Sequence, residues 1–488
     1  MKKILKNKKA TAGLVMLLFF AVLAIAGPFV ITDNPILTGS VAAGRMPVAV
    51  VSAYPEWYRD FTGNPDYTTN LSPLSNAKFS DPNELKMWQN STTSSGITVS
   101  YNSNEGAGVK GSLQINFNEA GNVTLTTQFY YPYVVPPPEY ATELYYSVQT
   151  QSQTGTAGNI TLYAYFLHQL AQGPKVLPAT TNFTIPDSNT PFTLVPYHII
   201  CSLDTDLYRE YGLNPCNTIF SSPGSYSFEI VVQFQGNATA SGNPTVLLSN
   251  VNLLVYGNSF GLLGTDDLGR DLFSQLIAGT QVSFILGLVT ALLTVVIGLI
   301  VGLVAGYVGG ATDEVLMRIT DMLLVIPSLP LMIVLVFVLG QSLLNLIIVI
   351  GFLGWMGFAR TVRSAILSMK ERSFIEAVKS SGGGRFYIIR KHLIPNVFPL
   401  VYITIAMSVP GAIVTEAALS FLGLGPQDVM SWGRILYEYE ISGNIATGAF
   451  NIWYWTIPPG VCIAALSLSF ILIGFALDEI LNPRLRER

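Results

Sequence analysis

Six long runs of apolar residues constrain this chain more than any other feature of its sequence. The first run extends from Ala10 to Ile31 and follows five lysines, and the others cover residues 281–308, 315–340, 343–359, 396–423 and 456–477. An apolar helix of about 20 residues can cross a bilayer. The first run ends in the small residues AIAGP, so a cleaved signal peptide is the alternative there, but its length and the five lysines favour a retained anchor. We therefore predict an α-helical polytopic membrane protein with six transmembrane helices.

The basic residues between the runs predict an orientation. Lys and Arg accumulate in cytoplasmic loops. The segment from Arg360 to Lys391 holds eight basic residues against two glutamates, and the tail after the last run holds several arginines. Both segments are therefore expected in the cytoplasm, which also places the N terminus there and residues 33–258 outside. A multi-pass protein of the plasma membrane satisfies these assignments.

The charges separate two unlike parts of the chain. Residues 33–258 contain 7 Lys and Arg against 15 Asp and Glu, net −8, whereas the remainder contains 19 against 15, net +4. Neither part supplies the basic face that a nucleic-acid partner needs. Three regions follow: residues 1–32 as N terminus and first span, 33–258 as an extracytoplasmic domain, and 259–488 as five spans with a cytoplasmic loop at 360–395.

Residues 33–258 are too long for a loop and show the pattern of a β domain. Runs such as SLQINF, ITLYAYFL and YSFEIVVQF alternate or are β-branched and aromatic, and turn-type clusters separate them. The pattern predicts an all-β sandwich or jelly roll from about residue 111, with 40–108 irregular. Its many tyrosines either bind sugars or peptides, or fill the core and a docking face. Cys201 and Cys216 lie on an oxidising side and form a candidate disulfide, with two unpaired thiols as the alternative.

Three motifs in the membrane part carry a resemblance to a known family. They are FGLLGTDDLGRDLFSQLIAGTQVS from Phe260, IEAVKSSGGGRFYIIRKHLIPN in the basic loop, and TEAALSFLGLG at the end of the fifth run. The chain resembles the permease subunits of oligopeptide/dipeptide binding-protein-dependent ABC importers, and specifically the second of their two membrane subunits. The resemblance covers Ala10 to Ile31 and everything from about Phe260 to the C terminus. Residues 33–258 stand where ordinary members have a much shorter connection.

The basic loop matches the EAA loop of ABC importer permeases in its spacing. The family pattern has Glu-Ala-Ala, three residues, a glycine, nine residues and a short ending with proline. Here the third position is valine, and two further glycines follow the family glycine. The resemblance implies that a short helix in this loop couples to an ATP-hydrolysing subunit; an ordinary basic loop is the alternative. The residues implicated are Phe374, Glu376, Ala377, Val378, Gly382, His392 and Pro395.

Other carboxylates invite a functional interpretation. The block before the second run is a signature of this subunit, and we expect its acidic residues to cap a helix, form an ion pair or gate the pore rather than bind a metal. Its residues are Gly264, Asp266, Asp267, Gly269, Arg270 and Asp271. Asp321 and Glu416 lie within or beside apolar runs, where a carboxylate calls for a functional hypothesis. Asp321 is expected to pair with Arg318, and Glu416 to contact another subunit or form a gate.

The sequence lacks the groups that would let the chain hydrolyse ATP. It contains no G-x-x-x-x-G-K-[ST] phosphate loop, and its three histidines are far apart. We therefore expect this chain to be a transport subunit without enzymatic activity or a cofactor of its own, and we expect partner subunits to bind ATP and Mg²⁺. The resemblance implies an importer of peptides, or else of oligosaccharides, working with a homologous second permease, two ATPase subunits and an extracellular substrate-binding protein. A membrane-anchored glycan- or peptide-binding protein without transport is the alternative, but it leaves five runs unexplained.

Overall fold

The chain forms two compact units in the computed structural model. One unit comprises Met1–Ile36 and Leu272–Arg488, and the other comprises Leu37–Asp271. The structure describes residues 7–31, 34–36, 48–74, 79, 84–104, 111–149, 158–168, 177–184, 193–194, 198–201, 215–239, 243–443 and 452–481. Residues 259–271, which the sequence analysis assigned to the membrane part, belong by their contacts to the second unit.

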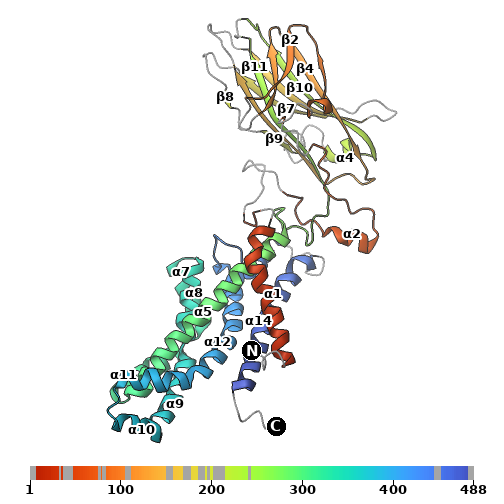
Figure 1. Ribbon diagram of the computed structural model, residues 1–488. Coiled ribbons are helices and arrows are strands. Elements are labelled where there is room, and N and C mark those ends of the chain that lie inside the picture. Colours follow the sequence, from red (N-terminus) through yellow and green to blue (C-terminus); the bar gives the residue numbers. More distant parts are fainter. Residues whose placement is uncertain are drawn as a thin grey trace. The chain divides into compact units, whose positions relative to one another are not determined.

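The first unit is helical and contains long apolar helices (Figure 1). Single helices long enough to cross a membrane are α1 (Lys8–Val30), α5 (Leu272–Val308) and α14 (Trp453–Leu481). A fourth continuous helical stretch runs through α11 (Arg385–Ile388), the π-helical η3 (Ile389–Leu393), α12 (Ile394–Leu419) and the π-helical η4 (Ser420–Leu424). The prediction of several membrane-spanning helices is confirmed.

Two bent helix pairs bring the number of candidate spans in the described chain to between four and six. The pair α6 (Gly310–Val325) and α7 (Ser328–Leu339) bends by 92°, and the pair α8 (Leu343–Gly354) and α9 (Met356–Lys370) bends by 41°. Pro327 causes the sharper bend, because a residue before proline avoids the helical conformation. Ile326 is accordingly extended, with ψ 128°. The run at 315–340 is therefore a broken helix, whereas the sequence suggested a continuous one.

Close contacts at glycines show how the long helices of this unit run relative to one another. A Cβ on Gly298 or Gly302 of α5 would lie 2.9 Å or 2.4 Å from the carbonyl oxygen of Trp355 or Ala359, so α5 and α9 run parallel in close contact. Gly27, near the end of α1, faces Ile277 near the start of α5, so these two helices are antiparallel. The end of α9 thus lies at the same end of the unit as the start of α1.

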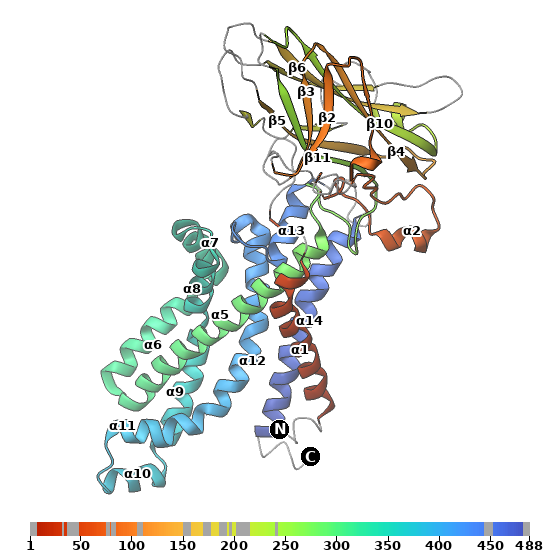
Figure 2. The same cartoon turned by 45° about the horizontal axis from the view of Figure 1, so that its top comes forward.

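Two shorter helices lie at opposite ends of the helical unit (Figure 2). The helix α10 (Ser373–Ser380) follows α9, and α13 (Trp432–Ile441) follows η4. Asn7 donates a hydrogen bond of 2.8 Å to Glu479, which joins the start of α1 to the last turns of α14. The starts of α1 and α12, the ends of α9 and α14, and α10 therefore share one end.

The second unit is an all-β region of two antiparallel sheets. One sheet has the order β1-β4-β10-β6-β7 and the other has the order β2-β3-β11-β5-β8, with β9 paired to β5. The strands are β1 (Gln89–Thr92), β2 (Ile97–Asn102), β3 (Ser112–Phe117), β4 (Gly121–Tyr131), β5 (Glu139–Gln149), β6 (Asn159–His168), β7 (Leu177–Thr184), β8 (Thr193–Leu194), β9 (His198–Cys201), β10 (Gly224–Gln235) and β11 (Thr245–Tyr256). Short helices are α2 (Glu56–Thr62), the 3-10 helix η2 (Glu84–Met87) and α4 (Pro215–Ile219).

Alternation along the strands builds one hydrophobic core from both sheets. Buried residues of β4 and β10, such as Leu125 and Phe228, share a cluster with Leu113 of β3 and Leu253 of β11. Tyr131, Tyr140, Tyr146 and Tyr226 belong to this core as well, whereas Tyr130 is 63% exposed. These four buried tyrosines therefore help to fill the core, and the expectation of an all-β region is confirmed.

The stretch 40–108 is more regular than its sequence suggests. It contains α2, η2, β1 and β2, although its sequence pattern predicts irregular chain there. The strands β1 and β2 are short and rich in Ser, Asn and Thr, so their pairing with β4 and β3 gives them a regularity that their composition does not. Cys216 is buried in α4, and Cys201 ends β9 with a side chain that lies outside the described part, so the disulfide stays a prediction.

Candidate functional site

The short helix α10 buries Ile375 and exposes three of the predicted residues, Phe374, Glu376 and Ala377. Ile375 is completely buried and Val378 is partly buried, whereas Phe374 is 38% exposed and Ala377 and Glu376 are exposed. Glu376 stands in the first turn and Lys379 in the last, which suits the helix dipole. The helix therefore displays a small exposed face with Phe374 and Ala377 on it.

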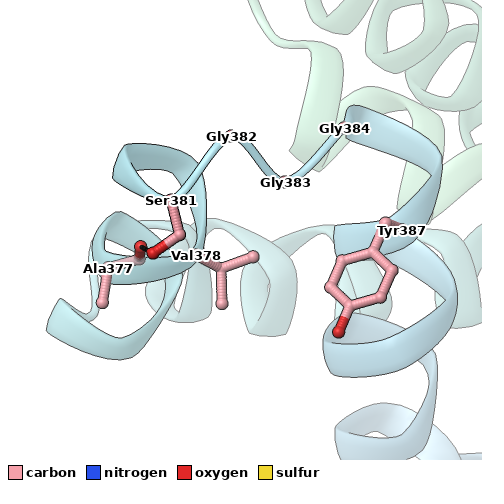
Figure 3. A pocket seen from close by; sticks show the side chains of 7 residues that line it. All are labelled: Ala377, Val378, Ser381, Gly382, Gly383, Gly384 and Tyr387. Carbon is pink, nitrogen blue, oxygen red and sulfur yellow. Dashed lines mark hydrogen bonds between the residues drawn. The ribbon is translucent and has the colours of Figure 1, made fainter.

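A glycine turn ends α10 and opens a cleft beside it. Gly382 adopts a left-handed conformation at φ +83°, which favours glycine. A Cβ on Gly383 would lie 2.6 Å from the side chain of Val378, so only glycine lets the chain return this closely. The open cleft has a volume of about 580 Å³ and is lined by Ala377, Val378, Ser381, Gly382, Gly383, Gly384 and Tyr387. Figure 3 shows Tyr387 across the cleft from Val378, with the three glycines joining the two sides.

His392 joins the two helical segments that flank the glycine turn. Its ring lies 6.2 Å from the ring of Phe374 in α10 and 5.7 Å from the ring of Tyr387 in α11, centroid to centroid. Pro395 follows at the start of α12, a position at which a missing backbone N–H is tolerated. The predicted residues of the loop thus come together in one structure around the turn.

Ile375 connects α10 to the long helices. It belongs to a buried cluster with Leu303 of α5, Val362 and Ile366 of α9, and Val397 of α12. An apolar side chain packed among three helices moves with them, because protein interiors are close-packed and transmit strain. Ile375 therefore connects α10 to three long helices by direct packing.

Two ion pairs hold α6 against α9 near the same end. Arg363 donates to both carboxylate oxygens of Asp313 at 2.5 Å and 2.6 Å, a bidentate arrangement. Asp321 pairs with Arg360 of α9. The expectation that Asp321 pairs with Arg318 is wrong, because Arg318 instead contacts Glu314, one turn away on its own helix.

Glu416 is a buried carboxylate within α12. It is completely inaccessible, and the hydroxyl of Ser420 donates a 2.7 Å hydrogen bond to its Oε1. Its Oε2 receives no hydrogen bond from the described residues. Ser420 begins the π-helical turn η4, so this carboxylate lies where the regular helix ends.

The acidic block before α5 is part of the β unit and is packed rather than open. Asp266 is fully buried, accepts backbone hydrogen bonds from Leu268 and Arg270, and contacts the Arg270 guanidinium at 2.6 Å. A Cβ on Gly264, at φ +73°, would lie 2.1 Å from the carbonyl oxygen of Ala53. Asp271 bridges back to Thr265, Gly269 supplies a second positive φ, and Asp267 is half-buried. Among the described residues, no group of three or more His, Cys, Asp or Glu is placed to hold a metal ion.

Several residues important to this arrangement are not among those that the sequence motifs predict. Ile375 and Tyr387 lie in the loop motif, and the i, i+3 spacing of Ile375 and Val378 was the available signal for the buried face. Gly298, Gly302 and Gly306 repeat every fourth residue, which is the small-xxx-small pattern of close helix contacts in membranes. No sequence signal identified the Asp313–Arg363 pair.

Comparisons with known proteins agree with these features. Residues 298–487 match the family model described as binding-protein-dependent transport system inner membrane component. The chain is 37% identical over 226 residues to the oligopeptide transport system permease protein OppC of Bacillus subtilis, covering 46% of this chain and 72% of that protein. It is 37% identical over 224 residues to the dipeptide permease DppC of the same organism, covering 46% and 68%.

A solved structure of the MetNI methionine ABC transporter in an inward-facing conformation is also similar. It has 17% sequence identity and a TM-score of 0.29, and the match covers 39% of this chain and 96% of that chain. A likeness at this level supports no further inference.

The long apolar helices, the broken pairs and the exposed loop helix define a multi-pass membrane permease. The chain belongs to the family of binding-protein-dependent transport system inner-membrane components, as its matches to the family model and to the oligopeptide and dipeptide permeases show. The resemblance stated from the three sequence motifs is thereby confirmed.

Proposed function

We propose that this chain is one permease subunit of an ABC importer for peptides and that α10 is the helix through which a partner ATPase drives it. The observation that carries the proposal is the division of α10 into two faces. Phe374 and Ala377 are exposed to a partner, while Ile375 is anchored among α5, α9 and α12. A partner groove that holds the exposed face would move the three helices as a body.

The ends of the helices support an orientation for this permease. The starts of α1 and α12 share an end of the helical unit with the ends of α9 and α14 and with α10. Most of the basic residues of the loop 360–395 lie there, and the positive-inside tendency favours the cytoplasm for that end. We assign residues 1–36 and 272–488 to a six-span permease part with cytoplasmic termini, and 37–271 to an extracytoplasmic β-sandwich.

The energy for transport comes from partners in this proposal. The sequence has no phosphate loop, so ATP and Mg²⁺ bind to two ATPase subunits rather than to this chain. A homologous second permease completes the pathway, and an extracellular substrate-binding protein delivers the solute. When the ATPases close on ATP, they shift the coupling helices and change the population of inward- and outward-facing states.

Peptides are the favoured substrate class because of the relatives. The two relatives described above are named as oligopeptide and dipeptide permeases. No observation on the helical unit favours oligosaccharides over peptides. The alternative of an anchored binding protein needs α1 alone, and it does not explain why Ile375 of α10 packs among three further helices.

The proposal is tested by the complex that forms around this chain. A tagged chain is purified from its own membranes, the copurifying proteins are identified, and ATP-driven uptake of labelled peptides is measured in proteoliposomes. We expect a second permease and a subunit with a phosphate loop, together with uptake that requires ATP.

One substitution and its matched control connect that result to α10. Ala377→Arg places a long charged side chain on the exposed face without touching Ile375, and it is expected to abolish uptake. Ala120→Arg puts the same side chain on an exposed turn of the β unit and should leave uptake unchanged. Equal uptake by the two variants would overturn the role assigned to α10, and a complex without any ATP-binding subunit would overturn the importer.

A further inference from the structure

An aromatic platform on the β unit is exposed at its α2 end. Trp57 and Phe61 are one turn apart on α2 and are 41% and 80% exposed. Leu262 is 57% exposed, and its carbonyl oxygen accepts a 2.9 Å hydrogen bond from the indole N–H of Trp57. We call Trp57, Phe61 and Leu262 the aromatic platform.

The platform is held rigidly rather than carried on a loose loop. The other side of α2 packs through Tyr58, which stacks on Tyr54 at 5.6 Å and meets Tyr67 edge-on at 5.4 Å. Backbone hydrogen bonds connect Glu56 to Gly261 at 2.9 Å and Tyr54 to Asn258 at 2.9 Å. The exposed aromatic side chains therefore stay exposed, because both chain segments that carry them are fixed to each other.

The covalent connection limits how far this platform can lie from Leu272, the first residue of α5. A Cβ on Gly27 would lie 2.9 Å from Ile277, so Ile277 is level with the last turns of the apolar α1. Leu272 lies five residues earlier in α5, about 7.5 Å along the axis. Since the apolar run of α1 ends at Ile31, about 6 Å beyond Gly27 on the same scale, Leu272 is level with the edge of the hydrocarbon.

Only a short tether separates Leu272 from the platform. Asp271 precedes Leu272 directly and is bridged to Thr265 in antiparallel fashion, which sets their Cα atoms about 5 Å apart. Leu262 is three residues from Thr265, and three residues span about 10 Å at most. The platform is therefore within reach of the headgroup layer, which is about 5–8 Å thick on each side of the hydrocarbon.

The chemistry of the platform fits a lipid surface. Tryptophan and phenylalanine with leucine are the residues that bury in the boundary between headgroups and acyl chains. The ionisable residues of α2 are Glu56, Arg59 and Asp60, and Arg59 lies over the ring of Tyr133 at 5.6 Å. Such a mixture gives no basic field for anionic lipids.

We propose that the aromatic platform inserts into the interface of the bilayer on the side where α1 ends, and so anchors the β unit to the membrane surface independently of its covalent connections. Burial of the exposed aromatic surface supplies the free energy, and no anionic lipid is required.

The test places a fluorescent reporter on the platform of the full chain in phosphatidylcholine nanodiscs. Phe61→Trp adds an indole at the platform. Ala120→Trp adds one at the exposed turn between β3 and β4. This turn precedes β4, whereas Tyr133, which contacts Arg59 of α2, follows the other end of the strand. The emission of each added indole is obtained by subtracting the spectrum of the unsubstituted chain. Both are measured with phosphatidylcholine brominated near the top of its acyl chains and with aqueous iodide.

We expect the indole of Phe61→Trp to emit at shorter wavelength, to lose most of its emission to brominated lipid and to resist iodide, at low and high salt alike. The indole of Ala120→Trp should behave in the opposite way. Trp57→Phe should remove a lipid-quenched component from the unsubstituted chain, which provides a second reading without an added residue. Quenching of the platform indole by iodide but not by brominated lipid would overturn the proposal. Protection from both quenchers that appears only on adding a substrate-binding protein would also overturn it, in favour of a protein partner.

Discussion

Replacement of Gly302 by alanine tests the packing on which the helical unit depends. A Cβ at this position would lie 2.4 Å from the carbonyl oxygen of Ala359 and 2.8 Å from the Cβ of Val362, whereas ordinary contacts begin at 3.4 Å. The Ala359 oxygen belongs to the backbone of α9, so no side-chain rotation can relieve the overlap. The two helices must separate locally by about 1 Å, the difference between these distances.

The expected cost follows from overpacking. Inserting a methyl group into a close-packed contact costs about 1–3 kcal/mol, and the separation also weakens the contacts at Gly298 and Gly306. Alanine gains about 1 kcal/mol of helix propensity over glycine. Gly411→Ala is the matched control, because Gly411 lies within α12 and a Cβ there meets nothing within 4 Å. The difference in stability between the two variants therefore isolates the cost of the overlap.

Thermal unfolding of the purified chain, followed by intrinsic tryptophan emission, measures this difference. A cost of 1 kcal/mol lowers the Tm by about 2–4 °C in a domain of 150–250 residues. We expect Gly302→Ala to melt several degrees below Gly411→Ala and to transport less, because α9 leads into α10. If Gly302→Ala melts at or above the control, the parallel close contact of α5 and α9 is wrong.

Three further predictions concern other parts of the chain. Gly264→Ala should disrupt the folded β unit, measured by protease resistance, since its Cβ would lie 2.1 Å from the Ala53 carbonyl oxygen. Gly63→Ala is the control: Gly63 also has a positive φ, but a Cβ there meets nothing within 4 Å, so the substitution should cost only about 1–2 kcal/mol. Equal protease resistance of the two variants would contradict the clash. Ile375→Ala should cost about 2–5 kcal/mol and leave ATP hydrolysis running without uptake, and full coupled uptake would remove Ile375 from the transmission path. Burial raises the pKa of Glu139 above its usual value, so its carboxyl favours folding most when protonated, and this stabilisation disappears as the pH rises through the raised pKa. Denaturant unfolding should show that Glu139→Gln flattens the dependence of stability on pH above about pH 4.3. Identical pH profiles for the two proteins would refute this role of Glu139.

The sequence predicted the class of this protein well because its signals are local. Apolar runs such as Ala10–Ile31 report the membrane directly, and the spacing from Glu376 to Pro395 keeps a loop motif intact. The strands of the β unit are predictable where polar and apolar residues alternate strongly in the sequence, as in β10, whose residues alternate between buried and less buried positions.

The features that the sequence missed depend on contacts between distant segments. Asp321 lies three residues from Arg318, yet its partner is Arg360 on another helix, because α6 packs against α9 and this brings the Arg360 guanidinium within ion-pair distance. The strand β1 has a polar sequence and exists as a strand through its pairing with β4. Residues 259–271 precede a membrane helix in the chain but hydrogen-bond to residues 52–56 instead.

The proposed function requires the exposed face of α10 to be the contact through which an ATPase drives this permease. A photocrosslinking amino acid at Ala377, introduced into the chain in its own membranes, tests it most directly, with the same group at Ala120 as the control. We expect a single major adduct at Ala377 that contains a subunit with a phosphate loop and whose yield changes on adding ATP, and no such adduct at Ala120. Adducts at Ala377 that contain only lipid or other proteins, in a complex still active in uptake, would contradict it.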